Sequence, residues 1–227
     1  MKGSLADRYR DYHAGRFYPE EFVYVPERLP VFVEAVGGPG NTVLDLGCRN
    51  GALAKHFLAG NEVVGVDVDS NALAQAAERG VTPVWADVEE PLPFDDGSFD
   101  AVVAGEILEH VRFPDQVIAE IGRVLKPDGV FVGSVPNAYR LKNRLVFLVG
   151  RPPEKNPMHL RMYSPDAIRR ELLPLGEATL TFVGGRFVRL GPRLFANDLV
   201  FVVRCQSRDS SASAVSRSPS SSATAGS

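Results

Sequence analysis

The sequence has few of the residues that disulfide frameworks and metal clusters require. Its 227 residues include 2 cysteines and 4 histidines. Two cysteines cannot build a disulfide framework, which favours a reducing compartment, and we expect the cytoplasm. The histidines and cysteines show no close paired spacing, and the zinc-protease pattern H-E-x-x-H is absent. The sequence therefore predicts no metal site.

Long apolar runs and an excess of positive charge are also missing. No window approaches the roughly 20 apolar residues of a membrane helix, and the N-terminal residues lack the apolar core of a signal peptide. The formal net charge of -3 gives no general attraction to polyanions. We therefore expect neither a nucleic-acid partner nor stable membrane insertion. The length suits one domain.

Short apolar runs alternate with helical segments along most of the chain. Strands are predicted at 42–46, 62–66, 82–86, 99–104, 129–135, 178–183 and 198–204, and helices at 26–36, 52–58, 70–79, 114–125, 138–149 and 165–172. We expect Ser70 to cap the third of these helices and Ser164 the last. The central alternation predicts a parallel sheet with helices on both faces.

The turn after the first strand predicts a cofactor site. Gly47 and Gly51 allow a sharp bend and a close approach of a ligand to the main chain. Neither G-x-G-x-x-G nor the phosphate loop G-x-x-x-x-G-K-[ST] is present here. Asp45 would repel a pyrophosphate, but it could accept from an ammonium or balance a sulfonium. The turn therefore favours S-adenosylmethionine over a nicotinamide dinucleotide.

Acidic residues end the next three strands. Asp67 lies about 20 residues after Asp45, the spacing at which α/β sheets place a carboxylate beside a ribose. Asp87 and Glu106 follow the third and fourth strands. Because the carboxyl ends of parallel strands meet at one edge, we expect these groups to gather there.

Several sequence blocks, in a fixed order, resemble a known family. They cover residues 43–48 with Gly51, then 66–69, 86–89, 92–100 and 125–129. These blocks are similar to those of class I S-adenosylmethionine-dependent methyltransferases. Residues 106–111, 135–137 and 159–165 resemble the small-molecule enzymes of quinone biosynthesis and of the methionine-biosynthesis-associated group. The resemblance implies a Rossmann-like, doubly wound α/β fold, with a seven-stranded sheet that is mostly parallel and has an antiparallel last strand.

The resemblance also implies roles for individual residues. The expected cofactor-binding residues are Asp45, Gly47, Cys48, Gly51, Asp67, Val68, Asp87, Val88 and Glu106. The expected acceptor-binding residues are Tyr9, Tyr12, Asn137 and Arg161. Asp87 would contact the adenine amino group, with Val68 and Val88 packing on the ring. The chain departs from the family at Arg49, because the family usually has glycine in the middle of the turn.

Methyl transfer depends mainly on orientation, so a catalytic residue is optional. For a hydroxyl acceptor, His110, which follows the fourth strand, and His159, in a later loop, are candidate bases. The alternative for each histidine is a purely structural role, in which its ring makes hydrogen bonds that hold the local fold. Glu106 could accept a hydrogen bond from the cofactor's ammonium group or from the methyl acceptor. Alternatively, its negative charge could interact favourably with the dipole at the start of a helix.

A basic group lies after the fifth strand: Arg140, Lys142, Arg144, Arg151, Lys155 and Arg161. It could hold an anionic group of the acceptor, or it could form a solvated charged face. The apolar residues 145–149 beside it would suit a hydrophobic methyl acceptor or transient contact with a membrane.

We predict an N-terminal aromatic lid or packing segment at 1–40, a methyltransferase domain at 41–205 and a disordered Ser-rich tail at 206–227. The predicted activity is methylation of a small-molecule acceptor on oxygen, nitrogen or carbon, by a monomer or homodimer. The alternative is a non-catalytic S-adenosylmethionine-binding scaffold or regulator, which Arg49 keeps open. A nicotinamide oxidoreductase and a nucleic-acid methyltransferase are less well supported.

Overall fold

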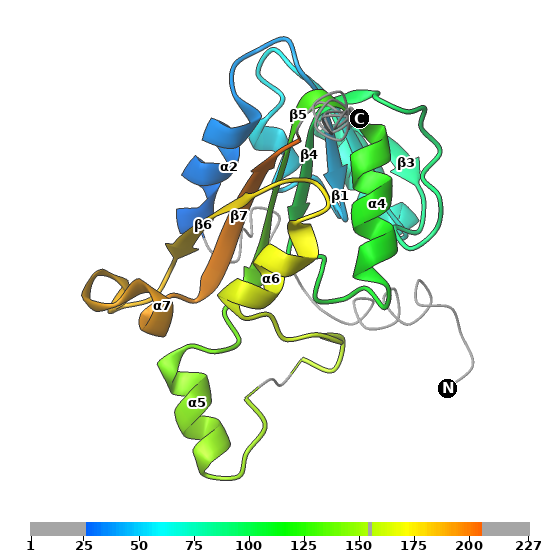
Figure 1. The fold of residues 1–227 in the computed structure, drawn as a ribbon. Coiled ribbons are helices and arrows are strands. Elements are labelled where there is room, and N and C mark those ends of the chain that lie inside the picture. Colours follow the sequence, from blue (N-terminus) through cyan, green and yellow to red (C-terminus); the bar gives the residue numbers. More distant parts are fainter. Residues whose placement is uncertain (1–25, 154–155, 206–227) are drawn as a thin grey trace, which may run out of the picture.

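The computed structural model describes residues 26–153 and 156–205, and its centre is a seven-stranded sheet (Figure 1). The strands are β1 (Thr42–Leu46), β2 (Glu62–Asp67), β3 (Thr82–Trp85), β4 (Phe99–Gly105), β5 (Leu125–Pro136), β6 (Ala178–Val183) and β7 (Asp198–Arg204). Their order in the sheet is β3-β2-β1-β4-β5-β7-β6. The first five strands pair in parallel, and β7 runs antiparallel to β5 and β6. The predicted Rossmann-like sheet with an antiparallel last strand is confirmed.

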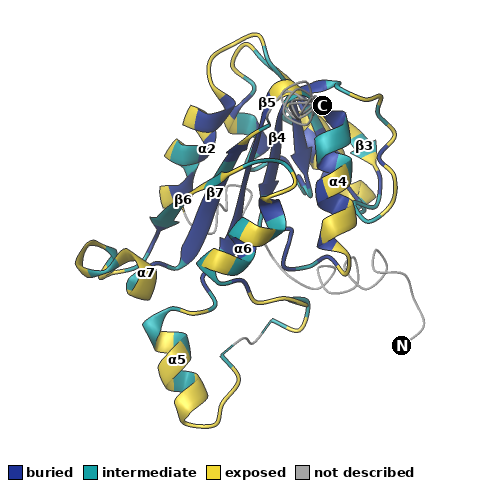
Figure 2. Cartoon of the chain, viewed as in Figure 1, coloured by how far each residue is buried: buried dark blue, intermediate teal, exposed yellow. Residues whose placement is uncertain are grey.

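Helices cover both faces of the sheet. The helices of the described residues are η1 (Pro26–Arg28), α2 (Leu29–Val36), η2 (Ala54–His56), α3 (Ser70–Glu78), α4 (Pro114–Val124), α5 (Leu141–Leu148), α6 (Pro165–Leu172), η3 (Val188–Leu190) and α7 (Pro192–Phe195). Successive strand residues point to opposite faces, so Val43 joins the core under α2 and α3, and Leu44 joins the core under α4 and α6. The central strands β1 and β4 are therefore buried on both sides, whereas α5 stands outside both cores (Figure 2).

Two helix predictions need correction. The helix expected at 52–58 is only the 3₁₀ turn η2, where Ala54 and Phe57 are both buried. Three residues per turn place positions i and i+3 on one side, which lets both side chains reach the core. The predicted cap Ser70 is the first helical residue of α3, and Asp69 caps the helix by accepting from the backbone N–H groups of Asn71 and Ala72.

Other segments differ only at their ends. The helix expected at 138–149 begins at Leu141, because Arg140 before it has an extended ψ of 155°. The cap at Ser164 is confirmed, since its Oγ accepts from the backbone N–H of Ala167 at 3.1 Å. Strand β5 begins at Leu125, and its pairing with β4 is irregular near the turn expected before residue 129.

The sheet brings four strand ends to one edge. Asp67, the last residue of β2, pairs in register with Trp85, the last residue of β3. Gly105, the last residue of β4, pairs with Ser134 near the end of β5. The acidic positions expected along this edge therefore lie on neighbouring strands.

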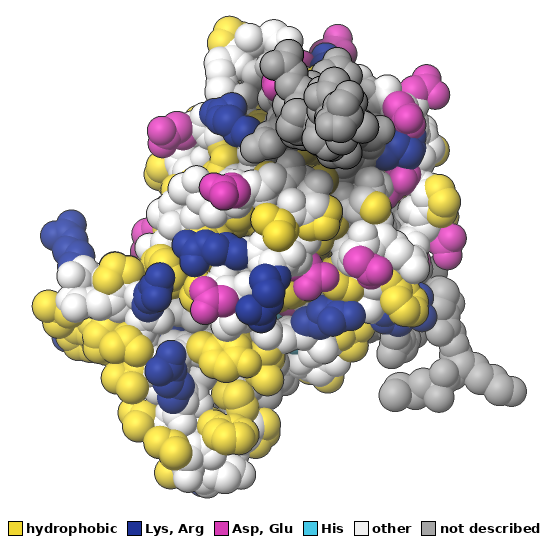
Figure 3. All heavy atoms as spheres, viewed as in Figure 1, with side chains coloured by type: hydrophobic (Ala, Val, Ile, Leu, Met, Phe, Trp, Pro, Cys, Tyr) yellow, Lys and Arg dark blue, Asp and Glu magenta, His cyan; other side chains and the backbone are white. Residues whose placement is uncertain are grey.

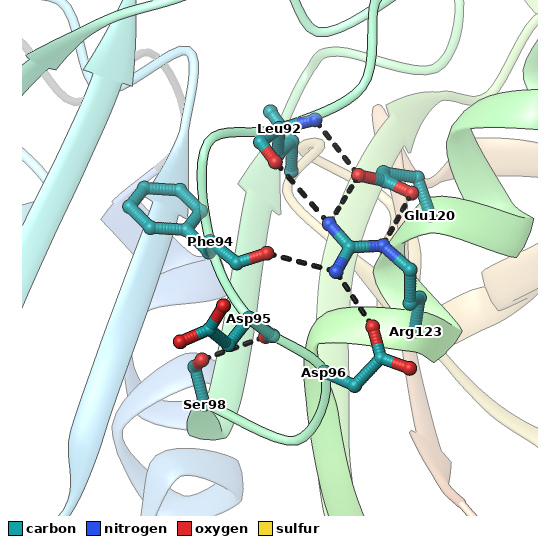
Figure 4. Close-up of polar contacts among 7 residues, drawn as sticks. All are labelled: Leu92, Phe94, Asp95, Asp96, Ser98, Glu120 and Arg123. Carbon is teal, nitrogen blue, oxygen red and sulfur yellow. Dashed lines mark hydrogen bonds and ion pairs between the residues drawn. The ribbon is translucent and has the colours of Figure 1, made fainter.

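Arg123 on α4 fastens the loop that leads from this edge back into β4 (Figure 4). Its guanidinium donates to the carbonyl oxygens of Leu92 and Phe94 at 3.2 and 2.8 Å, and it pairs with the carboxylates of Glu120 and Asp96. Glu120 in turn accepts from the backbone N–H of Leu92 at 2.7 Å. Charge-assisted hydrogen bonds from one helix residue thus fix a loop that has no regular structure of its own.

The structure describes only part of the predicted N-terminal segment and none of the predicted tail. Residues 1–25, which include Tyr9 and Tyr12, and residues 206–227 lie outside the described residues. Residues 26–36 form η1 and α2, and α2 packs beside β4 and β5. Within residues 26–153 and 156–205, no helix has the length and apolar character that crossing a bilayer requires.

Candidate functional site

The turn between β1 and η2 has a left-handed backbone at three positions. Gly47, Arg49 and Gly51 have φ angles of +68°, +48° and +76°. A Cβ on Gly47 would lie 2.1 Å from Cδ1 of Ile107, so a side chain cannot fit there without rearrangement. Arg49 adopts the left-handed conformation that glycine would adopt without strain, so the departure from the family pattern preserves the bend.

Asp67 fixes the shape of this turn. Its Oδ2 accepts from the backbone N–H of Arg49 at 2.9 Å, and its Oδ1 accepts from the backbone N–H of Asp69 at 2.9 Å. The carboxyl is buried, and burial raises its pKa although the two N–H donors oppose that shift. A carboxylate has about four lone-pair positions, so each oxygen retains capacity to accept from a ribose hydroxyl. Binding of the ribose stays a prediction.

Asp45 is a buried acid with an unused oxygen. It is 2% exposed, and its Oδ2 has no hydrogen-bond partner among the described residues. Burial, and secondarily the charge of Asp67, raises the pKa of Asp45 to about 8. A buried acceptor without a donor is costly. A cationic ligand at this edge would relieve that cost by stabilising the ionised form.

The third strand adds a residue that the sequence reasoning missed. Trp85 is 58% exposed at the sheet edge, and its indole N–H donates to the carbonyl oxygen of Val68 at 2.8 Å. Asp87, just beyond, accepts from the backbone N–H of Glu89 at 3.0 Å, and Val88 is half-buried beside it. Trp85 thus contacts Val68, one of the two residues predicted to pack on the adenine, and adenine binding stays a prediction. A lone tryptophan two residues before an acidic strand end was the available signal.

Glu106 belongs to a buried charge cluster that the sequence did not indicate. Its Oε1 accepts from the Ser134 hydroxyl at 2.8 Å and lies 3.1 Å from Nη1 of Arg28. The same Nη1 donates to Ser134 Oγ at 3.0 Å and lies 3.8 Å from Oδ2 of Asp198. Burial raises the pKa of Asp198 to about 7, and the charge of Glu106 adds to that shift. Glu106 itself has a φ of +61°, and its predicted contact with the cofactor's ammonium stays a prediction.

The two candidate catalytic histidines come together. The rings of His110 and His159 pack edge to face with centroids 4.8 Å apart, although the residues are far apart in sequence. His110 Nδ1 lies 3.0 Å from the carbonyl oxygen of Met158. A carbonyl only accepts, so Nδ1 carries the proton and the basic lone pair of neutral His110 lies on Nε2.

Glu109 completes this group. It is 1% exposed, and neither carboxylate oxygen has a hydrogen-bond partner among the described residues. Burial raises its pKa well above the usual range, and the charges of Glu106 and Asp198 add to the shift. Its Oε1 lies 4.0 Å from Nε2 of His110. Glu109, His110 and His159 each place one possible ligand atom within 4.8 Å of the other two. These three atoms could also hold a divalent cation.

The remaining predicted residues have structural partners. Asn137 is buried and donates to the carbonyl oxygens of Ala196 and Arg193, which ties β5 to the segment before β7. Arg161 donates to the carbonyl oxygen of Arg112 at 2.7 Å. Cys48 is buried, and its Sγ lies 2.6 Å from the place of a Cβ on Gly65, so its thiol packs against β2. Whether these three residues also touch ligands stays a prediction.

Comparison with known proteins gives consistent matches over this core. Residues 44–133 match the family model described as a methyltransferase domain. A probable S-adenosylmethionine-dependent methyltransferase of Mycobacterium tuberculosis is 32% identical over 155 residues, which cover 67% of this chain and 53% of that protein. The ubiquinone biosynthesis O-methyltransferase of Sodalis glossinidius is 36% identical over 123 residues, covering 51% of this chain and 49% of the enzyme.

Residues 44–133 match a methyltransferase domain, and the chain resembles the class I S-adenosylmethionine-dependent methyltransferases. It spans about half the length of most of the curated relatives that it matches. A solved S-adenosylmethionine-dependent methyltransferase from Archaeoglobus fulgidus shares the fold, with a TM-score of 0.63, 18% identity, and coverage of 78% of this chain and 91% of that one. The predicted family resemblance, including the likeness to quinone-biosynthesis enzymes, is confirmed.

The cofactor of this family, S-adenosylmethionine, fits the residues at the edge. Gly47 makes the sharp bend with a φ of +68°, and the unpaired buried Oδ2 of Asp45 provides an acceptor for positive charge. Asp67 and Asp87 provide further acceptors on the neighbouring strands.

Proposed function

We propose that this protein transfers a methyl group from S-adenosylmethionine to a small-molecule acceptor, at oxygen, nitrogen or carbon. The observation that carries the proposal is the arrangement of Asp45 and Asp67 around a bend with no room for a side chain at Gly47. The cofactor supplies an electrophilic methyl group on a sulfonium when it is bound. The protein holds it at the carboxyl edge through Asp45, Asp67 and Asp87.

The histidine pair supports an acceptor with an acidic hydroxyl. His110 presents Nε2 as a base, because the carbonyl oxygen of Met158 accepts from Nδ1 and fixes the tautomer. When Nε2 takes the hydroxyl proton, the imidazolium has the Glu109 carboxyl 4.0 Å away. Burial raises the pKa of Glu109, and the imidazolium charge beside it opposes that shift by favouring the ionised carboxylate. His159 packs on the ring of His110 and limits its rotation.

The proposal also includes the location, the class of acceptor and the assembly state. Cys48 is a buried free thiol, which suits the predicted cytoplasmic location. The acidic charge balance supports a small molecule rather than a nucleic acid as the acceptor. A monomer or homodimer remains our proposal for the assembly state.

The test is methyl transfer with labelled cofactor. The purified chain is incubated with methyl-labelled S-adenosylmethionine and a panel of phenols, amines and carbon nucleophiles, and then with cell extract, and products are found by mass spectrometry. A labelled small molecule is the expected result. Cofactor binding with no labelled product under any condition would instead support the non-catalytic alternative.

A variant of His110 tests the proposed base. For a hydroxyl acceptor, His110→Ala should lower kcat by about 10²- to 10⁴-fold while leaving cofactor affinity unchanged. His56→Ala is the matched control, because His56 is an exposed histidine on η2. Equal kcat values for the two variants would remove His110 from the proposed mechanism.

A further inference from the structure

Helix α5 buries none of its residues, although it contains an apolar run. Phe147, Leu148 and Val149, at its end, are 71%, 78% and 70% exposed. Short helices in proteins depend on packing of an apolar face for most of their stability. This helix packs only lightly, against α7, and leaves its largest side chains in solvent.

The segment between β6 and β7 continues this apolar surface. Leu190 at the end of η3 is 79% exposed, and Phe187 and Leu194 are exposed as well. Between α5 and this segment lies a groove of about 580 Å³. Its apolar lining includes Leu145, Val146, Val149, Phe187, Leu194 and Phe195. Figure 3 shows apolar side chains gathered on the lobe that Figure 1 identifies as α5 and α7, with basic side chains among them.

The same two segments carry only positive charge. Residues 138–153 contain Arg140, Lys142, Arg144 and Arg151, and residues 184–197 contain Arg186, Arg189 and Arg193. Neither stretch contains an aspartate or a glutamate, although the formal net charge of the whole chain is -3. These seven cations and the exposed apolar side chains therefore lie on the same two segments, without acidic residues among them. We call residues 138–153 and 184–197 together the basic apolar face.

We propose that the basic apolar face docks on the surface of an anionic lipid bilayer. Exposed apolar side chains insert into the headgroup region, and arginine and lysine bind lipid phosphates around them. Arginine and lysine also have apolar stems that lie along the inserted residues while the charged ends reach the phosphates. This is peripheral docking, in keeping with the lack of a membrane-spanning helix among the described residues.

The charge distribution favours a bilayer over a second copy of this chain. In a two-fold dimer the same patch meets itself, so the cations of one face would oppose those of the other. An anionic lipid surface instead neutralises every cation at once. An uncharged acceptor bound in the groove would cover Leu145 and Phe195, which line it. It would leave Leu148 and Leu190, which lie outside the groove, exposed to solvent.

Docking would bring the candidate active edge to the membrane. The backbone N–H of Asn137, just after β5, donates to the carbonyl oxygen of Asn197, just before β7, at 2.7 Å. Arg140 on the basic apolar face donates to the side chain of Asn197. The face and the edge are thus directly connected, although docking itself does not depend on methyl transfer.

Vesicle flotation of the full chain tests the proposal. Vesicles of phosphatidylcholine alone are compared with vesicles containing about one third phosphatidylglycerol, at low and high salt. We expect binding to the anionic vesicles and a large loss of it at high salt, because salt screens surface charge. No binding to anionic vesicles at low salt, or equal binding to both compositions, would overturn the proposal.

Variants with matched controls locate the contact. Leu148→Ser and Leu190→Ser should each weaken vesicle binding about tenfold, whereas Leu173→Ser, which replaces a 63% exposed leucine just after α6, should not. The pair Arg186→Gln and Arg189→Gln should weaken binding about 25-fold, at about fivefold per cation. Arg170→Gln, an exposed arginine on α6, is the control for that pair.

Two further measurements distinguish bilayer docking from unfolding of the variants and from dimer formation. Thermal unfolding should be unchanged in all these variants, because the replaced side chains are exposed. Size-exclusion chromatography should give the same assembly state for wild type and for Leu190→Ser. Dissociation of a dimer by Leu190→Ser would show that a second copy covers the face, and would overturn the bilayer proposal.

Discussion

Titration of Asp45 gives a direct pH signature of cofactor binding. Burial raises the pKa of Asp45 to about 8, so the free protein holds a proton there at neutral pH. A cationic cofactor needs the ionised carboxylate. Below pH 8 each pH unit should therefore cost about 1.4 kcal/mol, or tenfold in affinity. Asp45 is half ionised at pH 8, so between pH 8 and pH 6 the affinity for S-adenosylmethionine should fall about 50-fold.

The assay is isothermal titration calorimetry at pH 6, 7 and 8, in buffers of different ionisation enthalpy, to count released protons. The cofactor's own amino group titrates near pH 8, but it does so equally with every variant. Asp45→Asn should bind the cofactor more weakly than wild type at pH 8. Its affinity should also change less with pH, because the variant has no carboxyl to ionise at this position. Identical pH slopes for wild type and Asp45→Asn would refute the reasoning.

Folding stability provides a second readout for Asp45. Because its pKa is higher in the folded than in the unfolded chain, the folded protein binds more protons between pH 4 and 8. The contribution of Asp45 to stability is full below the unfolded pKa, and it is lost as the pH rises through about 8. Asp45→Asn should therefore lose less stability than wild type over that window, as measured by chemical denaturation.

Three substitutions test the turn and the loop. Gly47→Ala should lower the melting temperature and weaken cofactor binding, because a Cβ 2.1 Å from Cδ1 of Ile107 forces that side chain to shift at the bend. Gly150→Ala has a similar φ with open space around it and should show only mild strain. Arg49→Gly should retain binding and gain about 1 kcal/mol of stability, because a left-handed arginine is strained. Arg123→Ala should cost about 1 to 3 kcal/mol in chemical denaturation, since two loop carbonyls lose their donor.

The contrary outcomes are distinct. Equal effects of the changes at Gly47 and Gly150 would show that contact with Ile107 does not matter. Loss of binding in Arg49→Gly would show that the arginine side chain helps to hold the cofactor. An unchanged unfolding curve for Arg123→Ala would show that the loop is held by other contacts.

Local patterns predicted the sheet well. The bounds of β6 and β7 were predicted at their observed residues, because apolar alternation and turn residues mark both ends. The helix after Gly51 was predicted too long. Helix-forming residues indicate a helix there, but only the packed structure shows that Ala54 and Phe57 must both face the core.

The candidate site was predictable where it follows from sheet geometry. Asp45, Asp67 and Asp87 lie at one edge, because parallel strands end together. The contact of Arg28 with Ser134 joins residues 106 positions apart, and no local pattern indicates such a pairing. The double backbone contact of Asp67 depends on the shape of the turn, which spacing alone does not specify.

The central claim is that the bend held by Asp67 binds S-adenosylmethionine, and calorimetric titration of the cofactor into wild type and Asp67→Ala tests it most directly. Wild type should bind, and the variant should lose about 1.5 to 3 kcal/mol, or roughly 10- to 150-fold in affinity. Asp166→Ala, an exposed aspartate on α6, should bind like wild type. No binding by folded wild type, or equal affinity in Asp67→Ala, would contradict the account.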